Sequence, residues 1–498
     1  MTPRLRFGTA GIRGTLGEGP QHMNPELVEL AAIAIAQWLP AESIVIIGRD
    51  ARHGSGEFAH VIARVLSGSG HTPRSFDKPV PTPLVAYAVG SSNAAAGVMV
   101  TASHNPATDN GIKVYTADGG QLLPEGAAII EGAMDAHAWP DAVDTAAPSG
   151  AELVESGVIE EYLRTISDAV DEFPTDQSGV VVAYSAMHGV GGALFERALI
   201  QAGHRVHSVA EQHVPDPDFP TAPFPNPEEP GTLDLVVAHG DAVGADVVLV
   251  NDPDADRLAV SVPMGSAWQR LSGDQIGVLL GWYALQRASQ PCTVASSIVS
   301  STLLGKLARA RGARHVETFT GFKWLARAGG EGAPLVFAYE EALGYSVAPQ
   351  IKDKDGISAG LAFANLVAWL QADGRSVNDV LDEIGEEFGH HLNAQISVRF
   401  DGREASEEMG EVMRGLRTAA PSSIGDMDVV SIDDLAVGQR ARGNADVLIF
   451  NLKDGRLIIR PSGTEPKVKA YLEVIDRDVL VAQERLKKLA SGTQALLS

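Results

Sequence analysis

Residues 246–262 read DVVLVNDPDADRLAVSV: an apolar run enters an acidic loop and leaves it as a second apolar run. The run Val247–Val250 predicts a buried strand because it is short, rich in valine and bounded by polar residues. Ligands of open α/β sheets bind at the carboxyl ends of strands, so the loop that follows this strand is expected to form a site. The stretch therefore predicts a strand, a functional loop and a second strand of an α/β fold.

The passage from an apolar run through a glycine-rich or polar loop into a helix occurs three times along the 498 residues. This order is typical of α/β domains. Near the start of the chain, Asn24 and Pro25 mark the beginning of a helix. The expected elements are a helix over 24–39, strands within 43–52 and 95–103, a helix over 159–170, a strand over 180–185, a helix over 193–203, and further α/β segments over 293–312, 319–329 and 335–347.

The C-terminal part of the chain has a different pattern. Residues 447–474 predict antiparallel strands with Asp454-Gly455 as the hairpin turn, and a closing helix is expected over 480–491. Residues 138–150 lose periodicity and gather Pro, Ala, Ser and Gly, which predicts a linker. The predicted fold class is α/β, with three similar α/β domains plus a C-terminal α+β domain. The expected boundaries are 1–148, 149–262, 263–388 and 389–498.

Composition excludes several kinds of partner. The formal net charge of −24 opposes binding to nucleic acid and to anionic membrane surfaces. Cys292 is the only cysteine, so the chain can form neither an internal disulfide nor a thiolate zinc cluster. The start, MTPRLRFGTAGIRG, lacks the apolar region of a signal peptide, and Leu27–Leu39 is too short to span a membrane. These features predict a cytoplasmic protein with no nucleic-acid and no membrane partner.

The acidic loop NDPDADR places Asp252, Asp254 and Asp256 at alternating positions. Three clustered carboxylates repel one another without a cation, and oxygen-only ligands favour a hard ion such as Mg²⁺. An EF-hand does not fit, because Arg257 stands where that loop needs Gly and Pro263 where it needs Glu. A phosphatase-type aspartate loop lacks its usual Gly and Thr. A metal site is the preferred interpretation, and a solvated acidic turn is the alternative.

Two further loops combine cations with glycine. The stretch RPSGTEPK (460–467) offers an arginine fork, hydroxyls and a glycine to a phosphate group, although an ordinary turn is the alternative. Its candidate residues are Arg460, Ser462, Gly463, Thr464 and Lys467. The stretch FGTAGIRG (7–14) surrounds Arg13 with three glycines and matches neither the Rossmann fingerprint nor a Walker A loop.

The stretch VTASHNPATDNGIK (100–113) runs an apolar strand into Ser103, His104 and an Asn-Pro pair. Taken alone, Ser103 could begin a turn or cap a helix, or it could carry chemistry. TASHNP (101–106), DPDADR (252–257), TGFKW (320–324), EEALGY (340–345) and RPSGTEP (460–466) occur together in the order found in the α-D-phosphohexomutases. The chain therefore resembles phosphoglucomutases and phosphomannomutases from residue 7 to about residue 470.

The resemblance implies four domains around a central active-site cleft, with one loop from each domain. It implies that Ser103 is phosphorylated and that Mg²⁺ is bound by Asp252, Asp254, Asp256 and an oxygen of phospho-Ser103. The implied activity is the interconversion of a sugar 1-phosphate and 6-phosphate, of glucose or mannose, through a bisphosphorylated sugar. A sugar bisphosphate would be the activator, and a small sugar phosphate the partner of a monomer or homodimer.

The resemblance also implies the roles of further residues. Lys113 would serve acid–base chemistry, and Arg13 would steady the transferring phosphoryl group. An exposed lysine at the end of a strand is the alternative for Lys113. The other residues implied at the substrate are His104, Arg257, Gly321, Lys323 and Glu341, and the RPSGTEPK residues would grip the phosphate that is not transferred. His188 is expected to be structural.

The sugar-reading loop departs from the pattern of many bacterial members. Leu343 stands where they have Ser, and Tyr345 where they have His. Because the unperturbed pKa of tyrosine is about 10, Tyr345 receives no proton-transfer role. The motif sequences of this chain resemble more closely those of the branch that contains phosphoglucomutases and phosphopentomutases. A phosphopentomutase, a glucose-1,6-bisphosphate synthase and a non-catalytic sugar-phosphate sensor remain alternatives, and glucose phosphate is the first choice of substrate.

Overall fold

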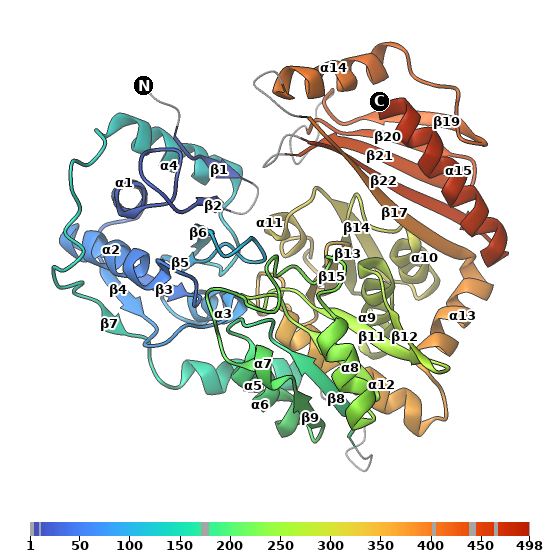
Figure 1. Cartoon of the computed structure of the whole chain (residues 1–498), viewed down its shortest axis with the longest axis horizontal. Helices are drawn as coiled ribbons and strands as arrows, with labels where there is room; N and C mark the ends of the chain where they lie inside the picture. The colour runs from blue at the N-terminus through green and yellow to red at the C-terminus, as the bar shows by residue number, and fades with distance from the viewer. Residues whose placement is uncertain are drawn as a thin grey trace. The chain divides into compact units, whose positions relative to one another are not determined.

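The computed structural model describes residues 4–8, 11–170, 179–400, 405–437, 445–462 and 467–497 (Figure 1). The chain forms two compact units. Unit 1 comprises residues 1–297 and 308–377, and unit 2 comprises residues 298–307 and 378–498. Unit 1 contains three separate sheets and unit 2 contains a fourth, which confirms the predicted fold class of three α/β domains and a C-terminal α+β domain.

The first domain is built on a seven-stranded sheet of order β1-β2-β6-β5-β3-β4-β7. Its strands are β1 (Phe7–Gly8), β2 (Gly11–Thr15), β3 (Ile44–Arg49), β4 (Thr72–Ser75), β5 (Ala96–Val100), β6 (Asp109–Thr116) and β7 (Glu152–Leu153). Its helices are α1 (Pro25–Trp38), α2 (Ser55–Gly68), α3 (Thr82–Ser91) and α4 (Pro124–Ala136). Helix α1 begins as predicted, because the Asn24 side chain accepts a hydrogen bond from the Leu27 amide at 2.9 Å.

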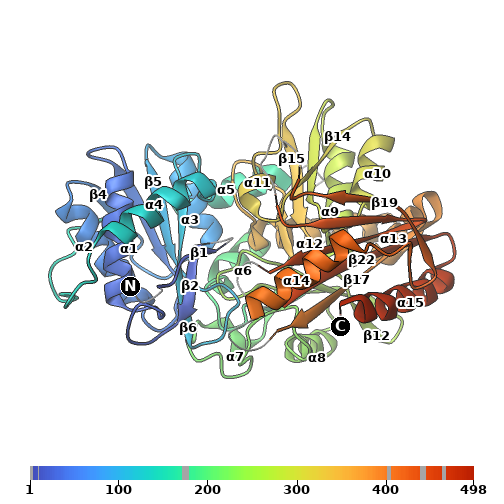
Figure 2. The same cartoon turned by 90° about the horizontal axis from the view of Figure 1, so that it is seen from above.

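Helices cover both faces of this sheet (Figure 2). Alternate residues of β3 and β5, such as Val45 and Val98, join one buried cluster with α1, α2 and α4. On the opposite face α3 approaches closely because two strand positions are glycine. A Cβ atom at Gly48 would lie 2.2 Å from Val85, and one at Gly97 would lie 2.4 Å from Val89. The close fit fixes α3, whose first residue reaches the candidate site.

The second domain has a five-stranded sheet of order β12-β11-β10-β8-β9. Its strands are β8 (Val181–Ser185), β9 (Arg205–Ser208), β10 (Val247–Val250), β11 (Ala259–Met264) and β12 (Ala267–Arg270). Its helices are α5 (Val158–Val170), α6 (Gly192–Gln201), α7 (Ala210–His213) and α8 (Asp234–Val243). Strands β10 and β11 pair antiparallel on either side of the acidic loop, so the predicted strand, loop and strand are confirmed.

The third domain has a four-stranded sheet of order β14-β13-β15-β16. Its strands are β13 (Thr293–Ser297), β14 (Arg314–Thr318), β15 (Leu335–Glu340) and β16 (Gly344–Ser346). Its helices are α9 (Gly273–Arg287), α11 (Phe322–Leu325) and α12 (Gly356–Ala372), and α10 (Leu303–Ala310) begins in the segment 298–307 of unit 2 and ends in unit 1. Helix α12 is apolar on nearly all sides because it packs against α5, α6 and α9 inside unit 1.

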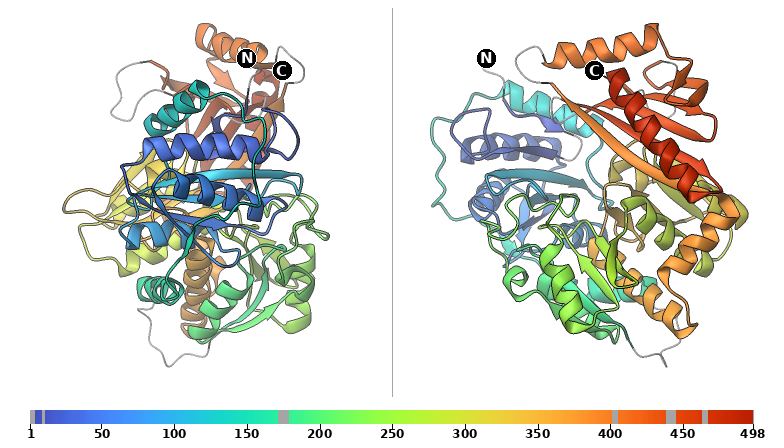
Figure 3. Two further views of the ribbon diagram at one scale, coloured as in Figure 1. Left: turned by 90° about the vertical axis from the view of Figure 1, so that its left-hand side faces the viewer. Right: turned by 45° about the vertical axis from the view of Figure 1, so that its right-hand side comes forward.

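Unit 2 has a six-stranded sheet of order β17-β22-β21-β20-β19-β18, and α15 packs against β17 and β22 (Figure 3). Its strands are β17 (His390–Arg399), β18 (Ser423–Ile424), β19 (Met427–Asp434), β20 (Leu448–Leu452), β21 (Gly455–Pro461) and β22 (Lys467–Asp476). Its remaining helices are α14 (Ala405–Thr418) and α15 (Val479–Leu497), and α13 (Val377–Phe388) leads into it from unit 1.

The β20–β21 hairpin is confirmed, but the predicted turn is one residue too late. Leu452 pairs with Gly455, so the two turn residues are Lys453 and Asp454. Asp454 adopts a positive φ of 64°, which Asp tolerates better than most residues. The predicted linker over 138–150 is irregular, and β7 follows it and pairs with β4. The exact domain boundaries stay a prediction. Across the described residues, no helix combines the length and apolar character needed to cross a membrane.

Candidate active site

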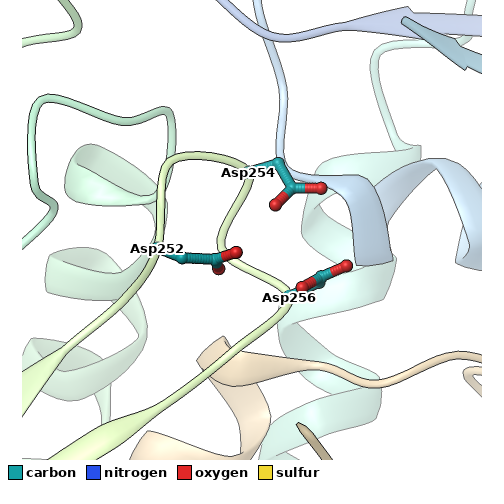
Figure 4. A group of neighbouring side chains, drawn as sticks. All are labelled: Asp252, Asp254 and Asp256. Atoms are coloured by element: carbon teal, nitrogen blue, oxygen red, sulfur yellow. The ribbon is translucent and has the colours of Figure 1, made fainter. Parts of the chain in front are cut away.

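The acidic loop brings three carboxylates together. Asp252, Asp254 and Asp256 are fully buried, and one oxygen from each lies within 4.8 Å of the others. Figure 4 shows the three side chains extending from the loop between β10 and β11 toward the same side. Ala255 has a positive φ of 55°, and its amide donates to the Asp252 carbonyl, so the loop is a tight turn rather than an extended strand. Such a cluster could hold a metal ion.

Two of these carboxylates share a buried lysine. Lys113 Nζ lies 2.7 Å from Asp254 Oδ2 and 2.7 Å from Asp256 Oδ2. Lys354 Nζ lies 2.9 Å from the same oxygen of Asp256, and Thr82 Oγ1 donates to Asp254 Oδ2 at 2.6 Å. The Oδ1 atoms of Asp254 and Asp256 are buried and have no hydrogen-bond partner among the described residues. A buried anionic oxygen without a partner is costly, so these atoms fit a bound cation.

The lysines set the charge of the triad. Burial opposes ionisation of all three carboxyls. At Asp254, burial and the charge of Asp256 are together outweighed by Lys113 and the Thr82 hydroxyl, which hold the pKa below the usual range. At Asp256 burial is outweighed by Lys113 and Lys354, and the pKa is lowered further. Burial and the charge of Asp254 raise the pKa of Asp252 well above its ordinary value. A divalent cation would favour the ionised form of all three.

Ser103 lies directly against this cluster. Its Oγ donates to Asp252 Oδ2 at 2.9 Å and lies 3.2 Å from His104 Nδ1, and the residue is 1% exposed. No helix begins between Thr101 and Lys113, all of which the structure describes, so Ser103 is not a helix cap. Burial, followed by the charges of Arg257 and Arg13, lowers the pKa of His104 well below its usual value. The imidazole beside Ser103 is therefore neutral near pH 7.

Strand pairing carries Lys113 and Arg13 to the same place. Strand β6 returns antiparallel to β5, so Lys113 lies opposite Met99 near the Ser103 loop. Arg13 on β2 lies opposite Gly111 of β6, and its Nε is buried without a hydrogen-bond partner among the described residues. Lys113 is only 2% exposed, which overturns the alternative of a lysine in solvent.

Arg257 follows the triad in the chain. Its amide donates to Asp252 Oδ1 at 3.0 Å, and its guanidinium pairs with Glu228 at 2.9 Å. The backbone of Arg257 also forms a β-bridge with Gly344 at the start of β16. The acidic loop and the third-domain loop are therefore held together inside unit 1.

The third domain contributes a second lysine. Gly321 has a φ of 116°, and its amide donates to Glu340 at 2.6 Å. Lys323 follows on α11, and burial lowers its pKa. A cavity of about 210 Å³ is lined by both Lys113 and Lys323. Glu341 accepts a hydrogen bond from Ser297 at 3.1 Å.

Leu343 and Tyr345, the two departures from the family pattern, are both buried. Leu343 has a positive φ of 62°. The Tyr345 hydroxyl donates to the Gly273 carbonyl at 3.2 Å, and its ring stacks on Tyr339. Burial raises the pKa of Tyr345 well above its usual value, so its hydroxyl is neutral and serves packing.

The candidate phosphate loop belongs to unit 2. The Arg460 guanidinium donates to Tyr471 at 2.9 Å and lies 5.5 Å from the centre of the same ring. The Ser462 amide donates to the Lys467 carbonyl at 2.8 Å. Gly463 and Thr464 lie outside the described residues. The part of this loop in the site stays a prediction.

His188 was expected to be structural. Its Nε2 lies 2.8 Å from Thr221 Oγ1, and its amide donates to the Gln212 carbonyl at 2.9 Å. These contacts hold together two loops of the second domain.

Sequence reasoning missed several residues of the site. Lys354 stands in the charged run KDKDG (352–356), a pattern that is typical of a solvated loop. Thr82 begins α3 with no motif around it, and Arg52 was seen only as the end of a strand and loop. Nothing in the sequence indicates that the first two contact the triad, because 98 or more positions separate Lys354 from it and 172 separate Thr82 from Asp254.

Comparison with known proteins agrees with this geometry. The chain matches the four family models described as phosphoglucomutase/phosphomannomutase domains I, II and III and C-terminal domain, over residues 4–140, 160–265, 272–388 and 422–485. A probable phosphomannomutase of Haemophilus influenzae is 39% identical over 95% of this chain and 98% of its own. A Staphylococcus haemolyticus phosphoglucomutase is 32% identical over 98% and 94%. Human phosphopentomutase is 31% identical over 97% and 87%.

The fold is also that of solved structures. A phosphoglucomutase/phosphomannomutase family protein of Burkholderia thailandensis aligns with a TM-score of 0.75 at 19% identity, covering 99% of this chain and 96% of that one. The chain belongs to the phosphoglucomutase/phosphomannomutase family, the α-D-phosphohexomutases. Within that class it is an enzyme of the phosphosugar mutase type, an intramolecular phosphotransferase.

Proposed function

We propose that this chain interconverts a sugar 1-phosphate and the corresponding 6-phosphate through phospho-Ser103 and a bisphosphorylated sugar. The observation that carries the proposal is the contact of 2.9 Å between Ser103 Oγ and Asp252, beside two buried carboxylate oxygens that have no hydrogen-bond partner in the described part of the chain. A sugar-phosphate sensor would need neither a phosphoryl carrier nor this cluster. Glucose phosphate is the first choice of substrate and mannose phosphate the second.

The chemistry is a phosphoryl transfer between oxygens. The bond from phosphorus to Ser103 Oγ breaks while a bond to a sugar hydroxyl oxygen forms, and that hydroxyl loses its proton. Ser103 Oγ gains a proton as the phosphoryl group leaves it, and Lys113, whose ammonium group pairs with Asp254 and Asp256, is proposed to donate that proton and to be reprotonated by the attacking hydroxyl. Arg13, whose Nε is buried and has no hydrogen-bond partner among the residues that the structure describes, would steady the phosphoryl group. The sugar bisphosphate then changes its orientation in the site. Its other phosphoryl group is transferred to Ser103, which restores phospho-Ser103.

The metal is proposed to be Mg²⁺, because the donor set is oxygen only. Asp252, Asp254, Asp256 and an oxygen of phospho-Ser103 would hold it, and when bound it supplies positive charge beside the transferring group. His104, Arg257, Gly321, Lys323 and Glu341 are proposed to contact the sugar phosphate. Arg460, Ser462, Gly463, Thr464 and Lys467 would hold the phosphate that is not transferred. A sugar bisphosphate is the proposed activator. Cytoplasmic location and a monomeric or dimeric state stay predictions.

A pentose phosphate is the second candidate substrate. It is favoured by the likeness to human phosphopentomutase over nearly the whole chain and by Tyr345, which replaces the histidine of many bacterial members. Net synthesis of glucose 1,6-bisphosphate is a further alternative. In that case the bisphosphate intermediate dissociates from the enzyme instead of changing its orientation in the site.

The test is a substrate panel scored by kcat/KM. Glucose, mannose and pentose 1-phosphates are supplied with a trace of the matching bisphosphate, and intact mass measures phosphate on the protein. The proposal expects turnover of a hexose phosphate and one phosphate on Ser103. Accumulation of free bisphosphate without isomer would indicate a synthase, and a protein never phosphorylated by any donor would exclude the mutase mechanism.

A further inference from the structure

Arg52 lies in the loop after β3, in the stretch GRDAR (48–52), and its side chain is 1% exposed. It does not reach the triad. Instead it extends beneath the loop that carries Ser103, between β5 and β6. A buried arginine must place its five donors, and here both terminal nitrogens, Nη1 and Nη2, are directed at one loop.

The guanidinium donates to four backbone carbonyls of that loop. Nη2 lies 2.6 Å from the Ser103 oxygen and 2.6 Å from the Asn105 oxygen. Nη1 lies 2.7 Å from the Pro106 oxygen and 3.2 Å from the Asp109 oxygen. Without Arg52 the buried Ser103 carbonyl would lose this donor, which is costly, whereas the part-buried Pro106 carbonyl would keep the Asp109 amide at 3.0 Å.

The loop needs such support because its backbone is strained at the reacting residue. Ser103 has a φ of 53°, in the left-handed region that residues other than glycine rarely adopt. The Ser103 carbonyl is held by Arg52, while the Ser103 amide donates to Thr101 Oγ1 at 2.8 Å. Both ends of the residue are thus fixed, and its hydroxyl is directed at Asp252.

Arg52 is itself held in place from two sides. Asp50 pairs with its Nε at 3.3 Å and is anchored by the Ser55 hydroxyl at 2.6 Å. The ring of Phe219, from the second domain, lies 4.9 Å below the guanidinium carbon and is 2% exposed. The arginine therefore links a strand end of the first domain, the Ser103 loop and a turn of the second domain, all within unit 1.

We propose that Arg52 is a positioning residue for phosphoryl transfer: its fork of donors holds the Ser103 loop in the strained conformation that directs Ser103 Oγ at the acidic triad. The inference rests on the proposed role of Ser103. Lysine cannot replace this arginine, because a single ammonium group cannot serve four carbonyls arranged for a planar fork.

The first experiment compares Arg52→Lys with Arg64→Lys. Arg64 is a matched control on α2, where it pairs with Glu29 at 2.7 Å and does not contact the loop. Misplacement of a reacting group by about 1 Å costs about 100-fold in rate. We expect Arg52→Lys to lower kcat by about that factor while KM changes little, and Arg64→Lys to keep both. Unchanged kcat in folded Arg52→Lys overturns the proposal.

The second experiment does not depend on turnover. Hydrogen exchange of backbone amides in residues 101–113 is expected to rise in Arg52→Lys and to stay at the wild-type level in Arg64→Lys. Phe219→Leu, which keeps the guanidinium but removes the ring, is expected to raise exchange less. Exchange unchanged in Arg52→Lys overturns the proposal even if every sugar phosphate fails as a substrate, so failure of the proposed function remains distinguishable.

Discussion

The two oxygens of Asp254 have different surroundings, and the difference has a consequence for metal binding. Oδ2 is occupied by Thr82 and Lys113, whereas Oδ1 is buried without a partner among the described residues. Thr82 also donates its amide to the Asp254 carbonyl at 2.9 Å. This one residue therefore fixes both the backbone and the carboxylate of a candidate metal ligand.

Replacing Thr82 by valine keeps the shape but removes the hydroxyl. Loss of a hydrogen bond that orients a metal ligand weakens metal affinity by about 10- to 100-fold. We expect Thr82→Val to bind Mn²⁺ more weakly by about this factor in calorimetric titration, and Thr82→Ser to restore the affinity. Equal affinities of the wild type and Thr82→Val would show that Asp254 needs no such orientation.

Replacing Ser103 by alanine removes the proposed phosphoryl carrier. We expect no detectable turnover and no added phosphate in intact mass, while loss of the bond to Asp252 costs about 1 kcal/mol of stability. Ser92→Ala, at the residue that follows α3, is the control, since that hydroxyl donates only to the Ala88 carbonyl of α3 in the contacts described. Normal turnover by the Ser103 variant would exclude the mechanism.

The residues that carry chemistry by their own type could be predicted from the sequence. Three aspartates at alternating positions and a serine after an apolar strand form recognisable patterns. The structure brings one oxygen of each aspartate within 4.8 Å of the others and Ser103 Oγ within 2.9 Å of Asp252. Lys354, Thr82 and Arg52 could not be found in this way. Each acts through a contact made only when segments far apart in the chain fold together, and none stands in a pattern of its own.

Helix α12 begins at a buried carboxyl group. Asp355 accepts hydrogen bonds from the amides of Ile357 at 2.9 Å and Ser358 at 3.2 Å, and from the Tyr162 hydroxyl of α5 at 3.0 Å. The cap therefore also ties α5 of the second domain to α12 of the third. Burial raises the pKa of Asp355 to about 6 despite these donors.

This raised pKa makes the stability of unit 1 depend on pH. A carboxyl whose pKa is higher in the folded state stabilises the fold below its unfolded pKa, near 3.8, and loses that contribution as pH rises through about 6. Asp355→Asn stays neutral, so its free energy of unfolding relative to wild type should rise by up to about 3 kcal/mol between pH 4 and pH 7. Denaturant titrations at several pH values measure this.

Asp373→Asn, at the exposed other end of α12, is the control and should show no such trend. A difference between Asp355→Asn and wild type that is constant with pH would mean that folding does not shift the pKa of Asp355. A difference that falls as pH rises would reverse the sign of the argument.

Most elements could be predicted because each has a local cause. Helix α1 has Asn24 and Pro25 at its start, and β10 is a run of buried apolar residues. The hairpin turn was misplaced because Asp-Gly is a common turn pair, whereas the pairing of Leu452 with Gly455 fixes the register. Strand β7 is only two residues long and was not predicted, because it forms by pairing with β4 and no local sequence pattern indicates it.

The candidate metal ligands and the C-terminal domain belong to different compact units of the chain. The triad, Ser103 and Lys113 all belong to unit 1, and the sheet of β17–β22 belongs to unit 2. Proteins of several domains often unfold in more than one step. A ligand that binds one folded unit stabilises that unit by mass action.

Chelation should therefore act on activity and on one part of the unfolding curve. A metal present at 100 times its dissociation constant contributes about 2.7 kcal/mol to the folded state that binds it. We expect a chelator to abolish turnover and to lower the unfolding temperature of unit 1, and added Mg²⁺ to restore both. Asp254→Asn, which lacks one ligand charge, should show a smaller response, and the transition of unit 2 should not move. Turnover that survives complete chelation would show that the mechanism needs no metal. The buried Oδ1 atoms of Asp254 and Asp256 would then need a partner other than a metal ion.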